Sequence, residues 1–209
     1  MRLVLASNNA KKLAELQSLF AALPVELVAQ GTLGIGEAEE PHGTFVENAL
    51  AKARHAAHSA GGPALADDSG LCVDALGGAP GVASAHFAGL VAPLADREAT
   101  RRAQDAANNT LLLERLQSAP QRRARFVSTL VALRSADDPE PLIAFGRWHG
   151  EILHAPRGDA GFGYDPLMFI PAQGCTAAEL PPGRKNEVSH RALAAAQMVQ
   201  LLRDVWALR

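Results

Sequence analysis

Residues 3–29 read LVLASNNAKKLAELQSLFAALPVELVA, and this stretch decides the fold class. Residues 3–6 are all apolar, as expected of a strand that is buried on both faces. The leucines and Phe20 between Ala10 and Leu23 fall on one stripe, which predicts a helix there. Val25–Ala29 is predicted to be a second short strand. Strand, helix and strand in this order favour an α/β fold with parallel neighbouring strands.

Three further helices are predicted downstream. Thr44 and Glu47 have the spacing of a capping box, in which each side chain binds the other's backbone donor, and the helix they open runs to about Ala60. A longer helix is expected over residues 96–118. The apolar residues between positions 187 and 208 predict a last helix.

Three segments are predicted to be strands. Residues 64–66 form a short apolar run, and residues 125–134 and 142–154 have extended patterns that suggest a hairpin around residues 136–139. The sequence has no internal repeat and no low-complexity linker, so residues 1–209 are expected to form a single domain.

Composition excludes several classes of protein. A net charge of −2 argues against a duplex nucleic acid partner, which would need a basic excess. Apolar runs stay well short of the roughly 20 residues that cross a membrane, and the opening apolar run is too short for a signal peptide. Cys72 and Cys175 are far apart and are expected to be reduced thiols. A cytoplasmic protein with no nucleic acid or membrane partner is expected.

The turn after the first strand is a candidate phosphate site. Backbone N–H groups at a helix N-terminus attract anions, and a lysine adds positive charge. The candidate residues are Ser7, Asn8, Asn9, Ala10, Lys11 and Lys12. Simple helix capping with solvated lysines is the alternative.

Carboxylates form a second candidate group. Asp67 and Asp68 follow the strand predicted at residues 64–66, and ligands collect at the carboxyl ends of strands in open α/β sheets. Glu39 and Glu40 are candidates for the same site. Mg²⁺ commonly binds one or two carboxylates together with substrate phosphates, and a free carboxylate can accept a proton from water. The alternative is an ordinary turn at Asp67-Asp68-Ser69-Gly70.

An aromatic turn and a basic cluster complete the candidates. Phe162 and Tyr164 flank Gly163, so the backbone can approach a ligand whose base stacks on a ring. A core aromatic beside a turn is the alternative. A second group is expected on the first turns of the last helix, where cations oppose the helix dipole and therefore suggest function: Lys185, Ser189, His190 and Arg191. His42, His55, His58, His149 and His154 lack metal-ligand spacing and are expected to be surface or packing residues.

Six motifs in this order resemble the Ham1-like inosine triphosphate pyrophosphatase family. The resemblance extends over nearly the whole chain, and it rests on residues 7–12, 44–49, 66–71, 76–82, 161–166 and 185–191. It implies a two-lobed α/β protein with a long, curved mixed sheet flanked by helices and an active-site cleft between the lobes. It also implies hydrolysis of ITP, dITP and XTP to the monophosphate and pyrophosphate by a homodimer that uses Mg²⁺, with Mn²⁺ as an alternative.

The resemblance also implies roles for residues. Residues 7–12 would bind the phosphates, and Asp68 would be both metal ligand and proton acceptor, with Glu39 or Glu40 as a further metal ligand. Ser69 would contact the substrate, and His190 and Arg191 would bind the 6-oxo group of the purine. The base and sugar would be held by Phe162, Gly163, Tyr164, Asp165 and Lys185.

Two departures and two alternatives qualify this interpretation. His86 stands where the family usually has Arg or Lys, so phosphate binding there would depend on pH, and Cys175 replaces a commonly basic residue. The Maf-like pyrophosphatases share an opening like Leu5-Ala6-Ser7 but continue with a Pro-Arg-Arg element. A nucleotide sensor without catalysis would not need Asp67, Asp68 and the upstream glutamates.

Overall fold

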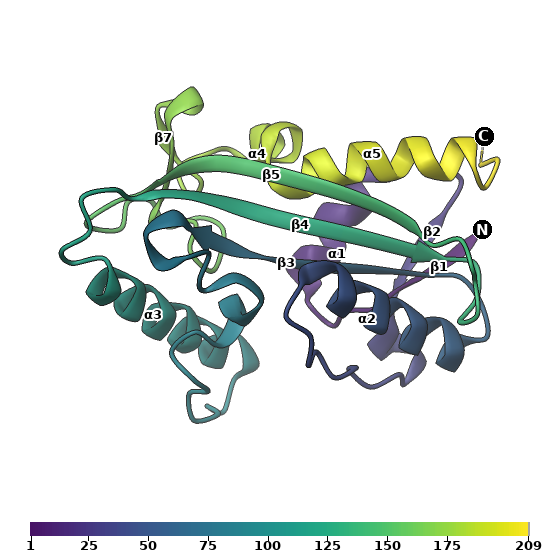
Figure 1. Cartoon of the computed structure of the whole chain (residues 1–209). Coiled ribbons are helices and arrows are strands. Elements are labelled where there is room, and N and C mark those ends of the chain that lie inside the picture. Colours follow the sequence, from purple (N-terminus) through teal and green to yellow (C-terminus); the bar gives the residue numbers. More distant parts are fainter. Residues whose placement is uncertain (209) are drawn as a thin grey trace. The chain divides into compact units, whose positions relative to one another are not determined.

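Seven strands form one mixed sheet in the computed structural model, which describes residues 1–208 (Figure 1). In sheet order they are β2 (Glu26–Ala29), β1 (Arg2–Leu5), β3 (Ala64–Val73), β4 (Arg123–Leu133), β5 (Leu142–Ile152), β6 (Met168–Ile170) and β7 (Cys175–Thr176). β1 pairs in parallel with β2 and β3, whereas β6 pairs antiparallel with β5 and β7. The predicted α/β class is confirmed, and the segments predicted as a hairpin are neighbouring strands.

The chain divides into two compact units. Unit 1 comprises residues 1–69, 128–147 and 186–209, and unit 2 comprises residues 70–127 and 148–185. β3, β4 and β5 each contribute residues to both units.

In unit 1, helices cover both faces of the strands. α1 (Ala10–Leu19) and α5 (His190–Asp204) share an apolar cluster with Leu3, Leu5 and Leu65. α2 (Phe45–Ala60) packs with Val4, Ala64 and Ala66, which alternate with the first set along the strands. Figure 1 shows α5 and α2 on opposite sides of the strands. Because both faces are buried, β1 is apolar throughout its interior.

Local sequence explains the ends of α2. Thr44 Oγ1 accepts a hydrogen bond from the Glu47 backbone N–H at 3.3 Å, as predicted. The Glu47 carboxylate, however, accepts from the Thr44 hydroxyl at 2.5 Å and not from its backbone N–H, so the capping box is only half formed. Gly61 ends the helix with a φ of 63°, a left-handed conformation that favours glycine.

Unit 2 contains α3 (Arg97–Arg115), capped by Asp96, and most of α4 (Pro182–Val188). Its buried residues include Phe126 and Trp148, whose ring centroids lie 6.4 Å apart.

Residues 1–208 also contain four short 3₁₀ helices: η1 (Gln30–Leu33), η2 (Asp74–Leu76), η3 (Gly81–His86) and η4 (Pro171–Gln173). None of the helices within residues 1–208 has the length and apolar character needed to cross a membrane.

Two helix predictions were wrong at their boundaries. α1 ends at Leu19, before the predicted Leu23, and Phe20 and Leu23 enter the core from the turn that follows. The single helix predicted from residue 187 is interrupted, because Ser189 leaves the helical conformation and accepts a hydrogen bond from the Ala192 N–H, which starts α5. Lys185 therefore lies in α4, whereas His190 and Arg191 open α5.

Candidate active site

Asp67 and Asp68 lie in the middle of β3, which is ten residues long. The prediction that a strand ends before them was wrong, and so was the alternative that residues 67–70 form a turn. Successive side chains of a strand point to opposite faces. Asp67 therefore shares the α1 and α5 face with Leu65, whereas Asp68 shares the α2 face with Ala66. Asp67 forms ion pairs with Lys12 and Arg191, and Asp68 forms one with Lys52.

On the α1 and α5 face, Asp67 is the centre of a buried ionic cluster. Its carboxylate lies 2.9 Å from Lys12 Nζ and 3.2 Å from Arg191 Nη2. It also accepts hydrogen bonds from the Ser69 hydroxyl at 2.6 Å and the Ser128 hydroxyl at 2.8 Å. Its side chain has no exposed surface. Burial alone would raise the pKa of Asp67, but Lys12 and Arg191 hold it well below 3.8.

Arg191 is itself buried and almost fully bonded. Its Nη1 binds Glu15, and its Nη2 donates to Asp67 and to Ser69 Oγ, the latter at 3.1 Å. Nε lies 3.4 Å from Asp67 Oδ2. The carboxylates of Asp67 and Glu15 overcome burial and raise the pKa of Arg191. Since a guanidinium has five N–H groups, one on Nη1 takes part in none of these hydrogen bonds.

On the α2 face, Lys52 connects two carboxylates. Its Nζ lies 2.9 Å from Asp68 Oδ1 and 2.8 Å from Glu40 Oε2. Burial raises the pKa of Asp68 to about 6, against the opposing effect of Lys52. Burial lowers the pKa of Lys52, but the two carboxylates outweigh it and the net pKa is raised. For Glu40, Lys52 overcomes burial and the pKa is lowered.

Asp68 and Glu40 are the carboxylates that could hold a magnesium ion, which stays a prediction. Among residues 1–208, Asp68 Oδ2 is buried and has no hydrogen-bond partner. The described residues contain no group of three or more His, Cys, Asp and Glu side chains that could hold a metal. That is compatible with Mg²⁺, which commonly takes one or two carboxylates and completes its octahedron with waters and substrate phosphates. Glu39 is exposed beside Glu40, and its role as a ligand stays a prediction.

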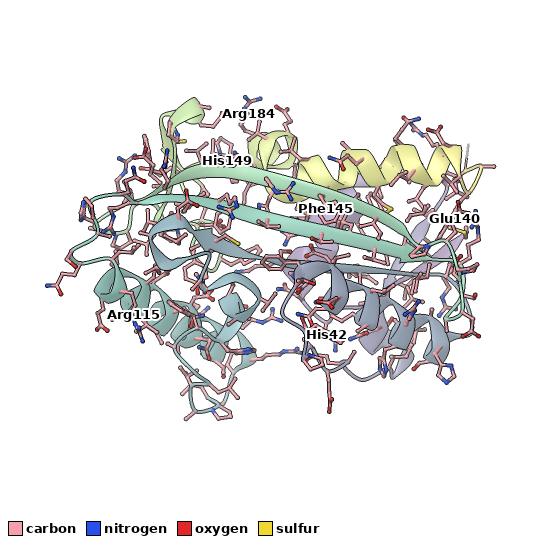
Figure 2. All side chains as sticks on the ribbon, viewed as in Figure 1. His42, Arg115, Glu140, Phe145, His149 and Arg184 are labelled. Atoms are coloured by element: carbon pink, nitrogen blue, oxygen red, sulfur yellow. The ribbon has the colours of Figure 1, made fainter. Side chains whose placement is uncertain are left out.

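The loop that carries Glu40 is fixed to α2. The Asn48 side chain accepts a hydrogen bond from the His42 backbone N–H at 3.0 Å and donates to the His42 carbonyl at 3.1 Å. The loop is thereby held close to Lys52, one turn further along the helix. Figure 2 labels His42 on this loop and His149 on β5. Both are exposed, as are His55, His58 and His154, so the prediction of surface histidines is confirmed.

The phosphate candidates lie at the N-terminus of α1. Asn9 is its cap and accepts hydrogen bonds from the backbone N–H groups of Lys11 and Lys12, so the capping alternative is confirmed for Asn9. Ser7 Oγ accepts from the Asn9 N–H at 3.2 Å, and the Asn8 amide donates to Glu37 at 3.2 Å. Ala10 and Lys11 are exposed. Phosphate binding by this segment stays a prediction.

In unit 2, Asp165 organises the aromatic turn. Its Oδ2 accepts hydrogen bonds from the Phe162 N–H at 3.0 Å and from Lys185 Nζ at 2.6 Å. Lys185 Nζ also lies 5.1 Å from the centroid of the Phe162 ring. The Phe162 side chain is half-buried and retains exposed surface, whereas Tyr164 is buried and its hydroxyl donates to the Ser84 carbonyl. The core alternative is thus confirmed for Tyr164, whereas Phe162 is half-buried, and base stacking on its ring stays a prediction.

Sequence reasoning missed several partners of these residues. Lys52 interrupts a stripe of buried alanines on α2, and a lysine in such a stripe signals a buried anion. Glu15 follows Lys12 by three residues on α1, the spacing of side chains on one helix face. Ser128 carries no local signal, because it reaches Asp67 only through strand pairing. His86, the predicted departure, is exposed at the end of η3.

Comparison with known proteins gives a consistent result. A family model described as the Ham1 family matches residues 3–201. The dITP/XTP pyrophosphatase of Methylibium petroleiphilum is 74% identical over 206 residues, which cover 99% of both chains. That of Leptothrix cholodnii is 66% identical over the full length of both chains. A solved HAM1 protein from Coxiella burnetii superposes with a TM-score of 0.87 at 44% identity, covering 97% of this chain and 98% of that one.

Proposed function

The chain belongs to the Ham1 family, and from this premise we propose that it hydrolyses dITP, ITP and XTP to the nucleoside monophosphate and pyrophosphate with Mg²⁺. The relatives named dITP/XTP pyrophosphatases support this activity. The product of the reaction cannot be reincorporated as a triphosphate without new phosphorylation, so the enzyme would remove deaminated purines from the nucleotide pool. We also propose that it acts in the cytoplasm as a homodimer.

The observation that carries the proposal is the asymmetry of the Asp68 carboxylate. Oδ1 is held by Lys52, whereas Oδ2 has no hydrogen-bond partner among residues 1–208. A buried carboxylate with a raised pKa is poised for proton transfer near neutral pH. A structural aspartate would be expected to have both oxygens satisfied, as Asp67 has on the opposite face.

Each part of the reaction has a residue assigned to it. A water oxygen attacks the α-phosphorus, its proton passes to Asp68, and the bond to the β-phosphate oxygen breaks to release pyrophosphate. Asp68 and Glu40 would hold Mg²⁺, which when bound neutralises charge on the phosphates. Lys12 and the N-terminus of α1 would bind the phosphates. Phe162 and Lys185 would hold the base and sugar, and Ser69 would contact the substrate.

Base selectivity follows from the chemistry of Arg191. Its remaining Nη1 N–H is a donor, and it would pair with the 6-oxo acceptor of a deaminated purine, beside His190. The 6-amino group of ATP presents a donor at the same place. The mismatch leaves a buried hydrogen-bond donor unpaired, which costs about 1–3 kcal/mol of binding free energy. Discrimination against ATP of about fivefold to 150-fold is therefore expected from this contact alone.

The test is to quantify pyrophosphate and orthophosphate from ITP, dITP, XTP, ATP and GTP, with and without Mg²⁺. Metal-dependent pyrophosphate from the first three supports the proposal. Asp68→Asn should abolish turnover, while Asp137→Asn, an exposed aspartate in the connection between β4 and β5, should not change it. Orthophosphate as product, or retained activity in Asp68→Asn, contradicts the mechanism. Tight binding of ITP without any turnover would instead indicate a sensor.

A further inference from the structure

Gly163, at the centre of the aromatic turn, is held by two side chains of α3. Asp105 Oδ2 accepts a hydrogen bond from the Gly163 N–H at 2.8 Å. The Asn109 amide donates to the Gly163 carbonyl at 3.0 Å. Because Asp105 and Asn109 are four residues apart, they lie on the same face of the helix. One helix face thus binds both backbone polar groups of a single residue that is more than fifty positions away in the sequence.

This turn needs an external restraint because of its glycines. Gly161 and Gly163 have φ values of 78° and 62°, in the left-handed region that favours glycine. Glycine also has the greatest backbone freedom, so a turn that contains two of them has many alternative conformations. Two hydrogen bonds to Gly163 select one of these alternatives.

The restraint fixes the position of the Phe162 ring. Phe162 directly precedes Gly163, and its own N–H is bonded to Asp165. On the other side, Tyr164 is anchored in the core of unit 2 by the bond from its hydroxyl to the Ser84 carbonyl, at 2.8 Å. Burial and, secondarily, the Asp105 carboxylate raise the pKa of Tyr164, so this hydroxyl stays protonated as a donor. The ring of Phe162 is therefore the one aromatic surface that the restrained turn presents.

We propose that Asp105 and Asn109 are positioning residues, which hold the turn around Phe162 in the conformation that stacks on the purine base. The proposal rests on the proposed function, because it assumes that Phe162 contacts a base. Both residues act through the Gly163 backbone. Holding the turn before the nucleotide arrives removes part of the entropy cost of binding. Their loss should therefore weaken nucleotide binding, with little effect on the chemical step.

The experiment compares substrates and ligands that have or lack a base. For Asp105→Ala and Asn109→Ala we expect KM for ITP to rise about tenfold, the effect of one lost hydrogen bond to an ordered group, with kcat within about twofold of wild type. The inhibition constant of inorganic tripolyphosphate, which has no base, should stay unchanged. Asp105→Asn keeps an acceptor for the Gly163 N–H and should retain a KM close to wild type.

Thr110→Val is the matched control on the same helix. The Thr110 hydroxyl donates to the Ala106 carbonyl within α3, and Thr110 is exposed. This variant should leave both KM and the tripolyphosphate constant at wild-type values. If Asp105→Ala fails to fold, as judged by circular dichroism, Asn109→Ala and Asp105→Asn decide the question.

Three results would overturn the positioning role. They are an unchanged KM for ITP in both alanine variants, an equal loss in Asp105→Asn and Asp105→Ala, and a parallel weakening of tripolyphosphate inhibition, which would indicate general structural damage. These outcomes leave wild-type turnover intact. A wild-type protein that releases no pyrophosphate from ITP would instead overturn the proposed function, so the two failures can be distinguished.

Discussion

Lys52 Nζ lies 2.9 Å from Asp68 Oδ1, and the same ammonium binds Glu40 at 2.8 Å. Lys52 thus forms ion pairs with two carboxylates at once. Burial raises the pKa of Asp68, Lys52 opposes this increase, and the Glu40 carboxylate adds to it. The state of Asp68 near neutral pH therefore depends on a lysine that lies on a different element, α2.

Replacing Lys52 should shift the titration of Asp68. In the metal-free protein Asp68 should titrate at about pH 6, and Lys52→Met should move this titration to higher pH, because the opposing positive charge is lost. Carboxyl ¹³C chemical shifts followed against pH measure this directly, with Asp68→Asn to assign the signal. Lys52→Arg keeps the charge and is the control. A titration in Lys52→Met at or below the wild-type pH would contradict the assignment.

Asp68 also makes the stability of the metal-free protein depend on pH. Its folded pKa of about 6 exceeds the ordinary value of 3.8, so the folded state binds the proton more tightly than the unfolded state. The resulting cost is small below pH 3.8, grows between about pH 3.8 and 6, and levels off at about 3 kcal/mol above pH 6. A cation bound at Asp68 in the folded state would offset this cost.

Mg²⁺ should consequently stabilise the folded protein at pH 8. A cation that binds only the native state raises the free energy of unfolding. Each increase of about 1 kcal/mol should raise Tm by about 2–4 °C for a chain of this size. Asp68→Asn should lose most of the increase, and Asp137→Asn should retain it. Differential scanning fluorimetry with a Mg²⁺ series, without nucleotide, tests this. An equal Tm increase in Asp68→Asn would exclude Asp68 as a ligand.

Asp67 should be essential for stability in a different way. Asp67→Asn removes the negative charge that Lys12 and Arg191 share in the buried cluster. We expect this to lower the free energy of unfolding by about 3–5 kcal/mol. Because the pKa of Asp67 lies well below 3.8, its contribution is fully present above that pH and is lost on further acidification. The difference in urea unfolding free energy between wild type and variant should be large at pH 7 and shrink below pH 4. A pH-independent difference would show that charge is not its cause.

The parts of the fold that the sequence predicted correctly are those in which local pattern and burial agree. β1 is apolar in its interior because both faces of the strands are covered, and α2 is bounded by Thr44 and Gly61, which have the expected backbone conformations. Ser189, by contrast, lies between two helical patterns. Its capping hydrogen bond with the Ala192 N–H separates α4 from α5, and the apolar pattern did not predict this break.

For the candidate site, the sequence named residues but did not predict where Asp67 and Asp68 lie in the fold. Asp-Asp-Ser-Gly favours turns by local preference, yet residues 67–70 continue β3. Residues distant in the sequence override that preference. Lys12 and Arg191 form ion pairs with Asp67, and the Ser128 hydroxyl donates a hydrogen bond to it. Such partners come from three separate elements, so periodicity and spacing within one segment could not reveal them.

Gly146 gives the last prediction, because it sets the distance between β5 and the start of α5. A Cβ atom at this position would lie 1.8 Å from the His190 carbonyl oxygen and 2.7 Å from the Ala194 backbone nitrogen. Gly146→Ala must therefore push α5 away from the strand, which we expect to cost about 3 kcal/mol of unfolding free energy. Since His190 and Arg191 open that helix, activity on ITP should fall at least tenfold even where the protein remains folded. Gly62→Ala is the control, because a Cβ there meets nothing within 4 Å. Urea unfolding and ITP hydrolysis measured on both variants test the prediction, and a Gly146→Ala protein within about 0.5 kcal/mol of wild type would show that α5 tolerates the displacement.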